Sequence, residues 1–354
     1  RYPHQVSGGQ LQRLMAAMAL CGSPDLLVLD EPTTALDVTT QIEVLKAFKS
    51  VIQREGSAAI YVTHDLSVVA QIADYIVVLY AGDMQEHGAA EQIVNAPTHE
   101  YTRRLMSAVR PPPAAGQGDE LGAEGELDHP ALEARNITAG YGKARDGSPL
   151  ITVLRDVSVS IEKGQAVGVI GESGCGKSTL ARVLSGLLPA SQGDVLLSGQ
   201  AIAGNLRQRS RSELQRVQFV FQMADTALNP RQRIDHILGR PIEFYLGLKG
   251  KEKRKRISEL LDMVELPQDF AGRYPEELSG GQKQRVNLAR ALAAEPEILL
   301  CDEVISALDS IVGANVIQLL KQLRRKTGVS FVFISHDLST VASFADEIIV
   351  LYAG

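Results

Sequence analysis

One internal repeat constrains what this chain can fold into. The stretch Ser7-Gly-Gly-Gln10 recurs as Ser279-Gly-Gly-Gln282, which lies 272 positions further along the chain. Several separated motifs at one constant spacing indicate a duplicated domain. Three other segments recur at the same spacing: Asp30-Glu31 as Asp302-Glu303, His64-Asp65 as His336-Asp337, and Leu79-Tyr-Ala-Gly82 as Leu351-Tyr-Ala-Gly354. We therefore predict two tandem copies of one domain.

The repeat also predicts the domain boundaries. We expect residues 1–109 to be the C-terminal part of a first copy and residues 135–354 to be a second copy, with a helical subdomain at about 205–290. Residues 110–134 have three consecutive prolines at 111–113 and are rich in Gly, Glu and Asp. They have too few large apolar side chains to order themselves and are predicted to be a flexible linker. Lys177 has no counterpart 272 positions earlier, so we expect copy 1 to lack its first half and the chain to be trimmed at both ends.

Short apolar runs predict the fold class. Runs at 165–170, 298–301 and 330–334 are continuous rather than alternating, and copy 1 has matching runs at 26–29 and 58–62. Such runs are typical of a parallel sheet that is covered on both faces. Longer segments between them, such as 311–325, have apolar residues at a helical spacing. The pattern predicts α/β architecture.

A glycine-rich segment follows the first of these runs in copy 2 and precedes a predicted helix at 177–187. Glycines allow backbone N–H groups to turn around phosphates, and the helix N-terminus adds positive potential. Lys177 is expected to contact the β- and γ-phosphates of a nucleotide, and the Ser178 hydroxyl to bind Mg²⁺. The predicted phosphate-binding residues are Gly171, Glu172, Ser173, Gly174, Cys175, Gly176, Lys177, Ser178 and Thr179.

Two further patterns complete the predicted site. The strand at 298–301 delivers Asp302 and Glu303 to the sheet edge where ligands bind in α/β proteins. Asp302 is expected to hold Mg²⁺, and Glu303 to orient or deprotonate the attacking water. Each Ser-Gly-Gly-Gln segment opens a helix without a phosphate loop beside it in sequence, so we expect it to serve a nucleotide that is bound by the other copy.

Taken together, these motifs resemble those of the ABC ATPases, and they occur in that family's order. The resemblance implies a P-loop NTPase fold with a helical subdomain, ATP and Mg²⁺ as ligands, and two copies that pair face to face. It assigns Gln222 to the Q-loop, with Mg²⁺ contact, and Ser306-Ala-Leu-Asp309 and Thr34-Ala-Leu-Asp37 to D-loops. The catalytic residues that it implies are Glu303, His336, Gln222, Glu31 and His64; the signature residues are Ser7, Gly8, Gly9, Gln10, Ser279, Gly280, Gly281 and Gln282; and Tyr141 is expected to stack on adenine.

Two longer segments resemble one subgroup, the peptide and nickel import ATPases. They are Ala227-Leu-Asn-Pro-Arg231 and Pro97-Thr-His-Glu-Tyr-Thr-Arg-Arg-Leu105. The resemblance implies an importer for dipeptides, oligopeptides, glutathione or nickel. It also implies two transmembrane permease subunits, an extracytoplasmic substrate-binding protein, and a peripheral location on the cytoplasmic face of the cell (inner) membrane. Within the sequence, nothing identifies the solute or the permeases.

Charge and composition help to distinguish between the alternative functions. The net charge is −6, so nucleic acid is not expected as the main partner. A tandem ABC protein that acts on ribosomes or DNA is the alternative function, but the acidic linker and the lack of paired cysteines argue against it. A third alternative is an inactive remnant, which the complete motif set of copy 2 opposes. The basic run at 249–256 fits either a solvated helix start or contact with lipid headgroups.

Overall fold

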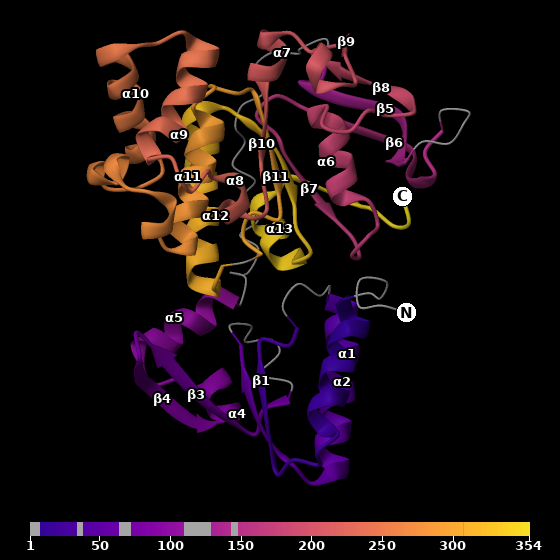
Figure 1. The fold of residues 1–354 in the computed structure, drawn as a ribbon, viewed down its shortest axis with the longest axis vertical. Helices are drawn as coiled ribbons and strands as arrows, with labels where there is room; N and C mark the ends of the chain where they lie inside the picture. The colour runs from indigo at the N-terminus through magenta and orange to yellow at the C-terminus, as the bar shows by residue number, and fades with distance from the viewer. Residues whose placement is uncertain (1–7, 34–37, 64–71, 110–128, 143–147, 307) are drawn as a thin grey trace. The chain divides into compact units, whose positions relative to one another are not determined.

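The computed structural model describes residues 8–33, 38–63, 72–109, 129–142, 148–306 and 308–354 (Figure 1). They form two compact units. Unit 1 comprises residues 1–115 with 309–314, and unit 2 comprises residues 116–308 and 315–354. Ser7, His64 and the segment 34–37 lie outside the described residues, as do Ala307 and most of the predicted linker.

Unit 1 contains two small sheets with helices packed on them. The parallel pair is β1 and β2, and the antiparallel pair is β3 and β4. In chain order its elements are α1 (Gly8–Leu20), β1 (Leu26–Asp30), α2 (Val38–Glu55), β2 (Ala58–Val62), β3 (Tyr75–Tyr80), β4 (Asp83–Ala89), α4 (Ala90–Asn95) and α5 (Glu100–Val109).

Unit 2 is built on a five-stranded parallel sheet and a four-stranded antiparallel sheet. The parallel sheet has the order β10-β11-β12-β7-β13 and consists of β7 (Ala166–Ile170), β10 (Val217–Val220), β11 (Ile298–Asp302), β12 (Ser330–Ile334) and β13 (Glu347–Val350). The antiparallel sheet has the order β6-β5-β8-β9 and consists of β5 (Leu132–Tyr141), β6 (Ile151–Ile161), β8 (Gln192–Leu197) and β9 (Gln200–Ile202).

In Figure 1, α9, α10 and α11 of unit 2 gather on one side, and α6 lies beside the antiparallel sheet on the other. The α-helices are α6 (Lys177–Ser185), α7 (Arg211–Arg216), α8 (Ala224–Ala227), α9 (Ile234–Pro241), α10 (Gly250–Met263), α11 (Gly280–Leu292), α12 (Ser310–Thr327) and α13 (Leu338–Phe344). Shorter turns are η2 (Leu206–Gln208), the π-helical η3 (Ile242–Leu246), η4 (Gln268–Gly272) and η5 (Pro275–Glu277). No described helix of either unit has the length and apolarity needed to cross a bilayer.

The central strands of unit 2 explain the apolar runs in the sequence. Every residue of β11 and β12 is buried. Leu300 and Val332 pack in one apolar cluster with β7 and α6, whereas Leu299 and Phe331 pack in a second cluster with α11 and α12. Because alternate side chains enter different clusters, both faces of the sheet are covered, and the run is apolar at every position.

Two predicted boundaries differ from the structure. Residues 132–134 were expected in the linker, but they form the start of β5, because Leu132 and Ala134 point into the core while Glu133 lies between them. The helical subdomain was expected from about 205, but β10 at Val217–Val220 pairs with β11 in the parallel sheet, so the helical part begins after it.

Four elements of unit 1 recur at the spacing of the repeat. Adding 272 to the bounds of α1, β1, α2 and β2 gives the bounds of α11, β11, α12 and β12. The burial of matching residues differs between the two units. Val28 is 61% exposed, and Leu300, at the matching position, is 0% exposed; Ile60 is 50% exposed and Val332 is 0% exposed. In unit 2 these positions are covered by β7 and α6.

Candidate functional site

The glycine-rich segment forms the turn between β7 and α6 of unit 2. Gly171 has φ +152°, and a Cβ there would lie 2.2 Å from the Leu351 carbonyl oxygen, so a larger residue does not fit. Gly176, with φ +112°, precedes the first turn of α6. The Lys177 ammonium is buried and donates to the carbonyl oxygens of Gly171 at 2.7 Å and Glu172 at 2.8 Å. The loop therefore already holds a cation at its centre, as an anion-binding turn requires.

The other loop residues differ in exposure. Glu172, Ser173 and Gly174 are exposed, so they form the rim of the turn. Cys175 is buried, and its sulfur lies 3.9 Å from Lys177 Nζ, so the thiol is part of the wall beneath the loop.

Ser178 and Asp302 come together although they are 124 residues apart in sequence. Ser178 Oγ donates to Asp302 Oδ1 at 2.9 Å. Burial is the main cause that raises the pKa of Asp302, and the hydrogen bond from Ser178 opposes it. A hydroxyl beside a buried carboxylate is an oxygen donor set that suits Mg²⁺, and a cation there would offset the cost of burying the charge. The residues therefore fit the ion that the sequence predicts.

Glu303 lies at the centre of a polar cluster. Gln222 Nε2 donates to Glu303 Oε2 at 2.7 Å and to Ser306 Oγ at 3.3 Å. His336 Nδ1 lies 3.6 Å from Glu303 Oε1. The interaction with His336 is the main cause that lowers the pKa of Glu303, and the same interaction raises the pKa of His336. Gln222, which was also expected to contact Mg²⁺, has its described side-chain hydrogen bonds with this cluster and not with Ser178 or Asp302.

The backbone of Glu303 has an unusual conformation. Its φ is +47°, in the left-handed region that side chains other than Gly, Asn and Asp rarely adopt. Its N–H donates to the Ile334 carbonyl oxygen at 3.0 Å, at the end of β12. The turn directs the carboxylate away from β11 and towards His336, which follows β12. Ser306, whose hydroxyl donates to the Glu303 carbonyl oxygen at 3.0 Å, completes the turn.

Tyr141 ends β5 and reaches the helix that follows the glycine-rich loop. Its hydroxyl oxygen lies 3.2 Å from Thr179 Oγ1 and accepts a hydrogen bond from Arg182 Nη1 at 3.1 Å. Sequence reasoning did not identify Arg182. Its spacing of three residues from Thr179 on one helix face was the signal available.

The signature of unit 2 begins a helix. Ser279 is the N-cap of α11; its hydroxyl accepts from the Gln282 N–H at 3.4 Å, while Gln282 Oε1 accepts from the Ser279 N–H at 2.9 Å. This reciprocal pair is a capping box. Gly280 and Gly281 carry no side chains, so the first N–H groups of the helix are accessible to an anion.

Unit 1 repeats part of this arrangement. Gly8, Gly9 and Gln10 open α1, and Glu31 follows β1. Glu31 has φ +45°, and its N–H donates to the Val62 carbonyl oxygen at 2.9 Å, as Glu303 does to Ile334. Ser7 and His64 lie outside the described residues.

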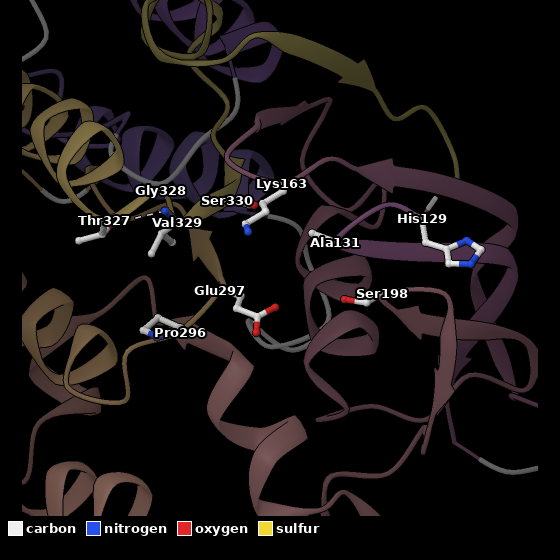
Figure 2. A pocket seen from close by; sticks show the side chains of 10 residues that line it. All are labelled: His129, Ala131, Lys163, Ser198, Pro296, Glu297, Thr327, Gly328, Val329 and Ser330. Carbon is white, nitrogen blue, oxygen red and sulfur yellow. Dashed lines mark hydrogen bonds between the residues drawn. The ribbon is translucent and has the colours of Figure 1, made fainter. Parts of the chain in front are cut away.

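A cavity of about 400 Å³ lies elsewhere in unit 2 (Figure 2). Pro296 and Glu297 precede β11, Val329 precedes β12 and Ser330 begins it, so the cavity is at the amino ends of these parallel strands. The predicted site is at their carboxyl ends, and the cavity includes none of the predicted site residues. Arg216 makes a bidentate contact with Glu297 at 2.8 Å.

Comparison with known families identifies the class of protein. A family model described as ABC transporter matches residues 1–34 and 154–306. These segments cover more than half of the chain, which therefore belongs to the ABC transporter family. The predicted P-loop NTPase fold of the ABC type is thereby confirmed.

Two relatives of known name are similar to this chain over its whole length. The glutathione import ATP-binding protein GsiA of Escherichia coli (strain K12) is 39% identical over 385 residues, and GsiA of Salmonella typhimurium is 38% identical over 384 residues. Both alignments cover 100% of this chain and 60% of the relative, so the chain spans less than two thirds of their length.

Solved structures agree with the fold. A dimeric ATP-binding cassette, MJ0796, in a post-hydrolysis state bound to ADP and Pi, has a TM-score of 0.55 and 34% identity, covering 63% of this chain and 95% of that chain. The protein cbiO1 of Clostridium perfringens, part of a transporter complex, has a TM-score of 0.55 and 25% identity, covering 64% of this chain and 86% of that chain.

Proposed function

We propose that this chain binds and hydrolyses ATP to energise an ABC importer for glutathione, peptides or related small solutes. The observation that carries the proposal is the convergence of Lys177, Ser178, Asp302 and Glu303 at the carboxyl ends of β7 and β11. The names of the relatives support the import function. We further propose that the partners are two permease subunits and an extracytoplasmic binding protein, and that the chain acts on the cytoplasmic face of the membrane.

Each side chain has a role in this proposal. Lys177 exchanges its two carbonyl acceptors for the β- and γ-phosphates. Ser178 and Asp302 would hold Mg²⁺, which would neutralise part of the phosphate charge. Tyr141 provides an aromatic surface for the base. Thr179, which contacts its hydroxyl, lies in the first turn of α6 together with Lys177 and Ser178.

Glu303 is the proposed general base, and the present geometry defines what must change before it acts. One carboxylate oxygen accepts from Gln222, and the other faces His336. A carboxylate that accepts one hydrogen bond and faces an imidazole takes a proton from water weakly, since its pKa is lowered. We infer that ATP draws His336 towards the γ-phosphate and thereby releases one oxygen of Glu303 for water.

We also propose that units 1 and 2 are two copies of one domain and that they pair when ATP is bound. The recurrence of element bounds and of the backbone at Glu31 and Glu303 supports duplication. In such a pair the N-terminus of α1, with Gly8 and Gly9, caps the nucleotide held by Lys177. The linker would keep the two units at a high effective concentration.

Glu303→Gln tests the function. The variant should bind ATP with wild-type affinity but hydrolyse it about 10²- to 10⁴-fold more slowly, the usual size of a general-base contribution. Lys177→Ala should lose ATP binding. Glu295→Gln is the matched control, because Glu295 is another glutamate of unit 2 with positive φ, and it should leave turnover unchanged. Wild-type turnover in Glu303→Gln would refute the assigned role.

A further inference from the structure

A short chain of hydrogen bonds fixes the Tyr141 hydroxyl. A guanidinium has only donors, so Arg182 donates to the tyrosine oxygen over 3.1 Å. The phenol proton is then available for Thr179 Oγ1, which lies 3.2 Å away. Thr179 and Arg182 are three residues apart in α6, so both project from one face of the helix that carries Lys177. The tyrosine is thus attached to the phosphate-binding helix at two points.

Among the described residues, the hydrogen bonds of the Tyr141 side chain are those to Thr179 and Arg182. Tyr141 is the last residue of β5, and its side chain is 38% exposed. Its neighbours are Gly140 and Gly142, which have no side chains to pack against it. A Cβ at Gly140 would lie 1.9 Å from the Ile151 carbonyl oxygen, so the backbone is held closely against β6. The contacts at the hydroxyl therefore help to fix where the ring lies.

We propose that Arg182 is a positioning residue for the nucleotide base. The inference rests on the proposed ATP site and adds a residue to it. By holding the Tyr141 hydroxyl, Arg182 keeps the ring at a fixed place relative to Lys177, and the base and phosphate subsites move as one body. A base that stacks on the ring then loses less ordering entropy on binding. The described side-chain hydrogen bond of Arg182 goes to Tyr141 and not to Lys177 or Ser178, and its charge opposes the rise in the pKa of Asp302.

The role predicts different effects on two ligands. Arg182→Met keeps an unbranched apolar side chain and removes the guanidinium that makes the hydrogen bond. We expect affinity for Mg·ATP to fall about 3- to 10-fold, the range for one partly exposed charge-assisted hydrogen bond. Affinity for Mg·tripolyphosphate, which has phosphates but no base, should stay within about 2-fold of wild type. Arg182→Lys should recover part of the ATP affinity, since lysine can also donate.

A double-mutant cycle isolates the pair. Tyr141→Phe retains the ring and removes the hydroxyl, so it should lower the affinity for ATP as Arg182→Met does. The double variant should bind ATP no more weakly than either single variant. Arg155→Met is the matched control. Arg155 is an exposed arginine of unit 2 whose described side-chain hydrogen bond goes to the Ala353 carbonyl oxygen, and its substitution should not change the affinity for either ligand.

The experiment is titration of the full chain and each variant with both ligands by calorimetry. An equal loss of affinity for ATP and for tripolyphosphate in Arg182→Met would overturn the inference, because it would mean that the guanidinium acts on the phosphates through its charge. Unchanged ATP affinity or additive single effects would also overturn it. A wild-type chain that binds no ATP would overturn the proposed function as well as this inference.

Discussion

The ion pair between Glu303 and His336 makes a pH-dependent contribution to stability. Glu303 raises the pKa of His336 above its ordinary value of 6.5, so the pair stabilises the folded chain fully below about pH 6.5 and loses this effect as pH rises through the raised value. His336 lowers the pKa of Glu303 below its ordinary 4.5, so the effect is also lost as pH falls below that value. The contribution is therefore greatest between about pH 4.5 and 6.5.

Its size follows from the distance and the exposure of the two groups. At 3.6 Å, two unit charges would attract by about 5 kcal/mol with an effective dielectric constant of about 20. The side chains are 33% and 21% exposed, so solvent screening and the cost of burial reduce this figure greatly. We take about 1 kcal/mol as the net contribution, which corresponds to about 2–4 °C in Tm for a domain of this size.

His336→Gln tests this reasoning, because glutamine can donate to Glu303 but carries no charge. The Tm of unit 2 should fall by about 2–4 °C at about pH 6 and by less at about pH 8.5, where less of the wild-type imidazole is protonated. Thermal melts followed by circular dichroism provide the measurement. His236→Gln, at an exposed position on α9, is the control and should show no such difference. An equal loss at both pH values, or a larger loss at the higher one, would refute the ion pair.

Two further predictions concern unit 1. Thr102, with the N–H and hydroxyl of Thr98, lowers the pKa of Glu86 to about 2, so the unit should lose stability as pH falls from about 4.5 towards 2, and acid titration of Glu86→Gln should lack that part of the loss. If α1 caps the nucleotide held by unit 2, Ser7→Arg should abolish ATP hydrolysis while Ser279→Arg has less effect; the reverse result, with activity that rises steeply with protein concentration, would show pairing between separate chains.

The motifs predicted the locations of the site residues better than they predicted their contacts. The strand predicted at 330–334 has those bounds in the structure, and the strand predicted at 298–301 extends by one residue to Asp302. A spacing pattern places a residue at a strand end, because backbone geometry is periodic. It does not give side-chain direction, so the bond of Gln222 to Glu303, and the contact of Arg182 with Tyr141, were not predictable.

The repeat separates what the local sequence determines from what the surroundings determine. Glu31 and Glu303 share a left-handed backbone and the same hydrogen bond to the end of the neighbouring strand. Yet Val28 and Leu300, each three residues before its glutamate, differ completely in burial. The strained turn therefore forms in unit 1 without the β7 and α6 packing that surrounds it in unit 2, and the strand pair is sufficient to impose it. Strain at the proposed base is thus a property of the β-strand exit and not a consequence of the polar cluster around Glu303.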